Sequence, residues 1–230
     1  MLGILFASLP HIFIGATLAS LIMIKGKVTI KKKLLIFAIC TIAVLSPDVL
    51  KVSSVLYSHA IWLAPLLGAF FTVLHEFLIK SEKPLMTWVK MTVIILVGHL
   101  FIDFIGNGAR LLYPFHKEEY IFSIISKLDF IFILFLAISF LLVFFHPKKN
   151  IVATVCLIAI AVYFSSLTYS KLQLEYTLKE KYNNEDIALL ITYPNDSLHW
   201  GYQVRTENLI VTGESPVLNE DIKIETRREI

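Results

Sequence analysis

Ionisable side chains interrupt several long apolar runs of this sequence, and five of them are of types that bind divalent metals. They are three imidazoles and two carboxylates: His11, Asp48, His59, His99 and Asp103. An ionisable group is costly to bury among apolar side chains, so each of the five is a candidate for function. Imidazole nitrogens and carboxylate oxygens are the ligands of zinc and related divalent metals. The set therefore predicts a divalent-metal site, with zinc as the expected metal.

The positions of these five residues within the apolar runs predict that they lie close together. His99 and Asp103 are four residues apart, so they share one face of a helix. If each run crosses a membrane as a helix rising about 1.5 Å per residue, all five fall at one depth near the outer leaflet, although they come from four different helices. The alternative for any single histidine is a packing or interfacial role. Five such residues at one depth favour the metal site.

The composition indicates a membrane protein. Of 230 residues, 57% are hydrophobic and only 17% are charged, whereas soluble domains carry about 25% charged residues. These values exclude a disordered chain, a coiled coil and an ordinary soluble enzyme. The net charge of +3 is too small to indicate nucleic-acid binding. Cys40 and Cys156 lie in apolar runs and give neither a disulfide framework nor a metal-binding spacing.

Six apolar segments are long enough, or nearly long enough, to cross a membrane, for which a helix needs about 20 apolar residues. They are residues 2–24, 34–45, 52–79, 86–105, 120–145 and 151–169. The second segment is short and ends in Ser46-Pro47-Asp48. It is either a span or a buried helix that stops inside the bilayer, sheltered by its neighbours.

Short basic loops predict the orientation, because such loops stay in the cytoplasm. Lysines follow the first, third and fifth segments: Lys25, Lys27, Lys31, Lys32, Lys33, Lys80, Lys83, Lys148 and Lys149. If six spans alternate, these loops share one side, so both termini are expected outside the cytoplasm; a miscounted span would change this. The first segment has no Lys or Arg before it and is too long for the core of a signal peptide. We interpret it as an uncleaved span of a multi-pass cell-membrane protein.

The charge changes sign along the chain and divides it into two parts. Residues 1–169 hold 14 Lys/Arg against 7 Asp/Glu, whereas residues 170–230 hold 7 against 11. The first part is expected to be a transmembrane helical domain with membrane lipids as its partners. The second begins with a polar helical stretch and continues with four β-type runs separated by turn formers, at 187–192, 202–205, 209–212 and 222–225. The expected fold class is an all-α polytopic membrane helix bundle with a small β-rich, extracytoplasmic C-terminal soluble tail.

Other ionisable residues in the apolar runs have weaker claims to a function. His75 and Glu76 lie near the inner end of the third segment, where an interfacial location is favoured. Lys90 lies where its ammonium group reaches the inner interface. Asp129 lies at outer-leaflet depth, and two interpretations stay open for it: a hydrogen-bonding partner of a metal-bound histidine, or a surface pairing near Lys127.

The order and spacing of several short motifs resemble a known family. The motifs are His11, Ser46-Pro47-Asp48, Ser58-His59, Gly98-His99-x-x-x-Asp103 and Leu111-Leu112-Tyr113-Pro114-Phe115. Over residues 8–116 this pattern resembles the YdjM-type inner-membrane metal-dependent hydrolases, which look distantly related to the zinc-dependent phospholipase C and nuclease superfamily. The stretch from Gly98 to Pro114 is the most specific part. Pro194 and Trp200 loosely resemble a tail found in some members.

The sequence departs from the family pattern at several positions. The second Asp of the family's Pro-Asp-x-Asp turn is Leu50, and a Ser after the second His is Ala60. Two positions of the family's His-Arg-Gly segment are Ser54 and Val55. In the family, the residues lost here are candidates for binding a second metal ion or the substrate. The resemblance therefore implies either a one-metal variant or a relative that kept the metal site and lost catalysis.

The resemblance implies hydrolysis of an ester or phosphoester, and the depth of the site suits a lipid-like substrate. Asp103 is then a further metal ligand or the catalytic general base, and Arg110 binds an anionic group of the substrate or, alternatively, anchors its span. The other ligands in this hypothesis are His11, Asp48, His59 and His99. Two other classes of function stay open: a non-catalytic membrane protein with a structural or sensing metal site, and an anchor whose acidic tail binds a partner.

Overall fold

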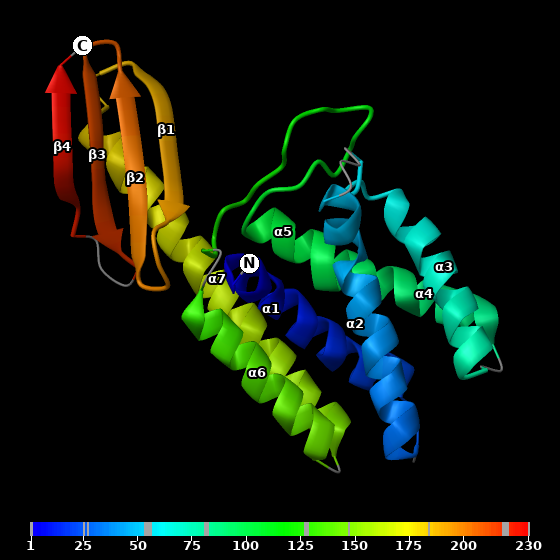
Figure 1. Ribbon diagram of the computed structural model, residues 1–230. Helices are drawn as coiled ribbons and strands as arrows, with labels where there is room; N and C mark the ends of the chain where they lie inside the picture. The colour runs from blue at the N-terminus through cyan, green and yellow to red at the C-terminus, as the bar shows by residue number, and fades with distance from the viewer. Residues whose placement is uncertain are drawn as a thin grey trace.

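Apolar helices make up one part of the molecule and a small sheet the other, as Figure 1 shows for the computed structural model. The structure describes residues 2–24, 26, 28–52, 57–80, 83–126, 129–146, 148–183, 185–217 and 221–229. The helices are α1 (Leu2–Leu18), α2 (Ile30–Val52), α3 (Leu63–Leu78), α4 (Pro84–Ile95), α5 (Phe101–Ile105), α6 (Phe130–Phe145) and α7 (Lys149–Lys181). π-Helical turns follow α1 at Ala19–Met23 and α4 at Leu96–Leu100. α7 extends beyond the other helices and carries the sheet (Figure 1).

Within the described residues, three helical stretches are long and apolar enough to cross a membrane. They are Ile30–Lys51, Pro84–Ile105 and Asn150–Lys181, and shorter apolar helices span Ser8–Met23, Leu63–Leu78 and Phe130–Phe145. Each of the six segments expected from the sequence therefore contains an apolar helix. The largely helical fold with a small C-terminal sheet is confirmed and is compatible with a membrane protein, whereas six crossings and their sidedness stay predictions.

The second expected segment is longer than its apolar run suggested, because α2 continues through Pro47 and Asp48. Proline has no N–H to donate, so Pro47 leaves the carbonyl of Ala43 without its helical partner. The hydroxyl of Ser46 donates to that carbonyl instead, at 2.7 Å. The helix therefore survives the proline, and Asp48 is carried on α2 itself rather than on a turn after it.

The third and fifth expected segments begin later than predicted. α3 begins at Leu63, with turns before it at residues 57–62, and α6 begins at Phe130. Asp129 caps α6, because its Oδ1 accepts a hydrogen bond from the backbone N–H of Phe132 at 2.9 Å. The residues before both helices are apolar, and for this reason hydropathy alone extended the two helices too far.

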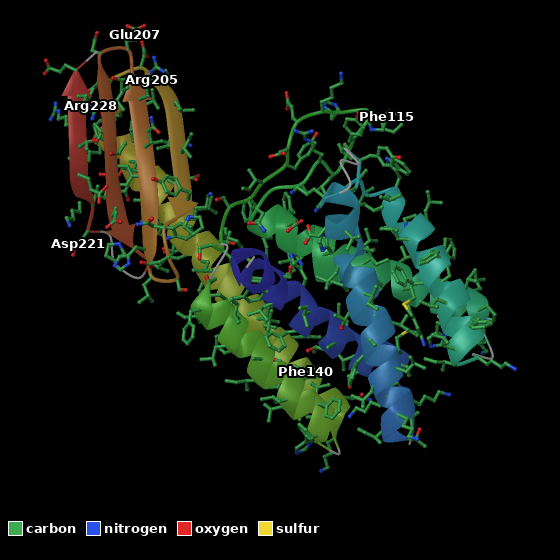
Figure 2. All side chains as sticks on the ribbon, in the orientation of Figure 1. Phe115, Phe140, Arg205, Glu207, Asp221 and Arg228 are labelled. Carbon is green, nitrogen blue, oxygen red and sulfur yellow. The ribbon has the colours of Figure 1, made fainter. Side chains whose placement is uncertain are left out.

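Two glycines allow three parts of the bundle to approach closely. A Cβ atom on Gly15 of α1 would lie 2.9 Å from Cγ2 of Val44, and one on Gly98 in the second π-helical turn would lie 3.0 Å from the same atom. Small residues of this kind let membrane helices pack with their backbones close together. α1, α2 and the π-helical turn therefore meet around Val44. Elsewhere Phe140 of α6, labelled in Figure 2, packs against Phe13 of α1 and Phe37 of α2.

The C-terminal sheet is an antiparallel meander in the order β1-β2-β3-β4, with strands Ile187–Pro194, His199–Thr206, Leu209–Pro216 and Lys223–Glu229. The four β-type runs expected from the sequence are confirmed. Along β2, the side chains of Trp200, Tyr202 and Val204 alternate on the buried face. They share one apolar cluster with Leu174 and Leu178 of α7. α7 is one continuous helix, so the expected sixth span and the polar helical stretch after it are parts of a single element.

Candidate metal centre

Four of the five residues singled out from the sequence come together in space. Asp48 lies on α2, His59 in the turn before α3, His99 in the second π-helical turn and Asp103 on α5. One ligand atom from each lies within 4.8 Å of the others, and we call these four residues the His/Asp group. Three of them are buried, whereas the side chain of Asp48 is 40% exposed. His59 was expected inside a helix; it lies in a turn, yet it still joins the group.

The distances within the His/Asp group fit tetrahedral metal binding. His59 Nε2 is 2.9 Å from Asp103 Oδ2, 3.1 Å from His99 Nε2 and 3.5 Å from Asp48 Oδ1. His99 Nε2 is 3.4 Å from Asp103 Oδ2 and 3.8 Å from Asp48 Oδ1. Ligands bound at about 2.0–2.1 Å with tetrahedral angles are about 3.3 Å apart. The five distances lie on both sides of that value, and all four donor atoms lie within 4.8 Å of one another, close enough to share a single ion.

Hydrogen bonds at Nδ1 turn two of the histidines toward the group. His59 Nδ1 is 2.8 Å from Ser58 Oγ. His11 Nδ1 is 3.0 Å from the carbonyl oxygen of Gly98, and because a carbonyl only accepts, this nitrogen donates. The Nε2 of His11 faces the carboxylate of Asp103, which also only accepts, so this contact is a hydrogen bond when Nε2 carries a proton as well. Sequence reasoning assigned no role to Ser58, although it stands next to His59 in the family-like motif.

His11 lies beside the His/Asp group rather than within it. Its Nε2 is 3.5 Å from Oδ1 of Asp103, whereas the other oxygen of Asp103 faces His59 and His99. The rings of His11 and His99 are packed together with centroids 4.4 Å apart. Asp103 thus sits at the centre of the arrangement, with three imidazoles around its carboxylate. His11 was expected to bind the metal directly, and its position also suits the orientation of Asp103.

The region around His99 has an unusual backbone that positions Asp103. π-Helical turns inside α-helices often occur at functional sites, and Leu96–Leu100 contains His99. After α5, the N–H groups of Gly106 and Gly108 donate to the carbonyl of Asp103, at 3.2 and 2.7 Å. Gly108 has a φ of +85°, which glycine adopts readily. The side chain of Asn107 adds a hydrogen bond to Asp103 Oδ1 at 3.3 Å. The loop therefore holds both the backbone carbonyl and the side chain of Asp103.

His99 has one unsatisfied polar atom. Its side chain is fully buried, and its Nδ1 has no hydrogen-bond partner among the described residues. An unpaired buried polar group costs free energy. The ring is held instead by packing between the rings of His11 and His59. Only its Nε2 therefore makes polar contacts, and these are all with members of the His/Asp group.

The charges of the site suit a divalent cation. Metal-binding imidazoles are neutral, so the two carboxylates leave the site with an excess of negative charge. A buried charge without compensation is strongly unfavourable. A divalent ion offsets both carboxylates and takes the imidazole nitrogens as further donors. The nitrogen and oxygen donors thus fit zinc or a related metal.

Asp129 and Arg110, two other residues singled out from the sequence, have polar partners in the structure. Asp129 accepts hydrogen bonds from the hydroxyls of Tyr163 on α7, at 2.9 Å, and Ser197, at 3.1 Å, besides capping α6. These contacts give it a role in packing, and its other expected neighbour, Lys127, lies outside the described residues. Arg110 follows the loop that holds Asp103, and its Nε is 3.4 Å from Glu119 Oε1.

Comparisons of the chain with protein-family models, curated proteins and solved structures give no match. The resemblance to the YdjM-type hydrolases therefore rests on the motif residues alone. Of the departures from that family, Leu50 and Ala60 are described, whereas Ser54 and Val55 lie outside the described residues. The fold and the site define the chain as a largely apolar helical protein with a candidate metal centre.

Proposed function

We propose that this protein is a membrane-bound metal-dependent hydrolase of an ester or phosphoester. One observation carries the proposal: three donors on the buried side chains of His59, His99 and Asp103 lie together beside the partly exposed carboxylate of Asp48. Catalytic zinc sites differ from structural ones by keeping one position open to water or substrate. The exposure of Asp48 supports an opening on its side of the group.

The residues of the group have different roles in this proposal. When bound, the metal lowers the pKa of a coordinated water toward about 7 and polarises a carbonyl or phosphoryl oxygen. His59, His99 and Asp103 bind the metal. Asp48, the most exposed of the four, accepts the proton of the attacking water as a general base. Asp103 is less suited to that step, because its two oxygens already face the three imidazoles.

Aromatic side chains near His59 support a substrate at a membrane interface. The rings of Tyr57 and Trp62 stack with centroids 5.6 Å apart, and Trp62 Nε1 donates to the carbonyl of Tyr113 at 2.7 Å. Phe115, on the loop between α5 and α6, is 86% exposed (Figure 2). Tyr and Trp are enriched where a membrane meets water. The proposed substrate is therefore an amphipathic ester or phosphoester with its headgroup at the interface, and Arg110 binds its anionic group.

The proposed topology has six crossings, with both termini and the sheet outside the cytoplasm. The lysines between the first and second, third and fourth, and fifth and sixth helical segments support it. Three of the apolar helices are short for a bilayer. A short helix is tolerated where neighbouring helices shelter its ends or the bilayer thins locally.

The number of donors in the His/Asp group favours a second function, in which the metal is structural. Four protein ligands complete a tetrahedral shell, and structural zinc sites are closed in this way. If Asp48 binds the metal instead of accepting a proton from water, the protein is a non-catalytic membrane protein with a structural or sensing metal site.

Metal analysis combined with turnover separates the two functions. Detergent-purified wild-type protein and an Asp48→Asn variant are analysed for metal and assayed on a panel of esters and phosphoesters. The hydrolase proposal expects bound metal in both proteins and turnover in the wild type only. Bound metal without turnover on the whole panel supports the structural site. A wild-type protein that binds no metal even after incubation with zinc contradicts both functions.

A further inference from the structure

A basic pocket lies between α2, α3 and α4, away from the His/Asp group. Its volume is about 400 Å³, and four lysines and a histidine contribute to its lining: Lys32, Lys80, Lys83, Lys90 and His75. Lysine side chains at a membrane surface usually extend separately toward water. Here α2, α4 and the α3–α4 connection contribute lysines to the lining of one cavity, and α3 contributes His75. We call this cavity the lysine pocket.

The charges around the lysine pocket are predominantly positive. His75 is 5% exposed, and its Nδ1 is 3.4 Å from Oε1 of Glu76. Lys32, Lys90 and Glu76 all lie within electrostatic range of the His75 ring. Among the described residues that line the pocket there are four lysines and no carboxylate. Lysines that line one cavity give it a positive potential, which attracts an anion.

The start of α4 adds to the positive potential of the lysine pocket. α4 begins at Pro84, directly after Lys83, and both Met86 and Thr87 from its first turn line the pocket. The N-terminal end of a helix carries a partial positive charge and favours anions. The helix end and the lysines therefore act in the same direction.

We propose that the lysine pocket binds a phosphate-bearing anion. Ammonium groups bind phosphoryl oxygens through charge-assisted hydrogen bonds. A volume near 400 Å³ lies toward the small end of ligand pockets and suits a phosphate group with a small substituent. An anionic phospholipid headgroup and a free phosphate share this chemistry. The binding site does not depend on the metal centre, because none of its lysines contributes to the His/Asp group.

Two matched double variants of the full-length protein test the proposal. Lys32→Gln/Lys90→Gln removes two charges from the lysine pocket. Lys31→Gln/Lys148→Gln removes two exposed lysines that do not line it. Circular dichroism and size-exclusion chromatography check that each variant folds. If the first pair does not fold, the exposed Lys83→Gln replaces it.

The first arm of the experiment uses native mass spectrometry of protein taken from bilayers of equal parts phosphatidylglycerol and phosphatidylcholine. The second arm follows tryptophan fluorescence during titration with inorganic phosphate at constant ionic strength, since Trp88 on α4 directly follows Thr87, which lines the pocket. We expect the pocket variant to weaken binding by roughly 25-fold, from about fivefold for each lysine, and the control variant to change it by less than about twofold.

The two arms distinguish the source of the anion. If the wild type and the control variant retain phosphatidylglycerol and the pocket variant does not, the bound anion is a lipid headgroup. If the wild type and the control variant bind phosphate saturably, the pocket variant does not, and no protein prefers one lipid, the bound anion is a free phosphate. Equal behaviour of both double variants in both arms overturns the proposal.

Discussion

The two ionisable clusters of the helical bundle differ in charge and burial, although both draw on α2 and on the helical stretch that begins with α4. In the His/Asp group, imidazoles and carboxylates approach to between 2.9 and 3.8 Å, and three of the four residues are buried. In the lysine pocket, like charges surround an open cavity. Lys32 and Asp48 lie on the same helix, roughly 24 Å apart at 1.5 Å per residue. One helix therefore serves two sites of opposite charge.

This difference teaches that neighbours, rather than residue type, indicate the ligand. His59 and His75 are both buried histidines. His59 faces two carboxylates and an imidazole, so a cation completes its surroundings. His75 has lysines within electrostatic range and lines a basic pocket, so an anion completes its surroundings. His75 is therefore a matched control for the histidines of the His/Asp group.

The largest effect on metal affinity is expected from Asp103→Asn. This change removes the negative charge that three imidazoles surround while keeping the volume of the side chain. We expect metal affinity to fall by about 100-fold or more, because a ligand charge is lost together with the group that orients the others. Competition with a chromogenic chelator measures the affinity. Wild-type affinity in this variant would remove Asp103 from the site.

A smaller effect is expected from His11→Ala. Its Nε2 reaches the outer oxygen of Asp103, so its loss should loosen Asp103 without removing a donor of the four. Partners that orient a ligand typically contribute about 10–100-fold to affinity, and the same competition assay resolves this range. A loss as large as that of Asp103→Asn would make His11 a direct ligand, as the sequence alone suggested.

The smallest effect is expected from removing the sheet. A truncation after Lys171 should leave metal content within about twofold of the wild type, because the His/Asp group lies wholly in the helical part. Two tail residues of ligand type are already paired with each other: His199 Nδ1 is 3.0 Å from Asp196 Oδ1. Metal analysis of the purified truncation checks this. Loss of the metal would show that the tail completes the site.

Much of the candidate site could be predicted from residue types and order. His11, Asp48, His59, His99 and Asp103 were expected to meet because their positions in the apolar runs put them at one depth, and the structure brings the last four together. The orienting contacts could not be predicted in this way. The bond from His11 to the carbonyl of Gly98 depends on how two helices cross, and no sequence spacing encodes that distance.

The helix boundaries were less predictable, for a local reason. A proline normally ends a helix, so the sequence favoured an end before Asp48, yet one hydroxyl on Ser46 replaces the missing hydrogen bond. Apolar residues before α3 and α6 lengthened the predicted spans, because hydropathy does not distinguish an apolar turn or loop from a helix. The strands were easier to locate, since turn formers separate short alternating runs.

The central claim is that the His/Asp group, and not histidine content in general, binds a divalent metal. The most direct measurement is the metal content of the detergent-purified wild type, His99→Ala and His75→Ala, determined by inductively coupled plasma mass spectrometry after incubation with zinc and removal of the excess. The account predicts about one ion per chain in the wild type and in His75→Ala, and less than about a tenth of that in His99→Ala. Metal that persists without His99 but is lost without His75 would contradict it.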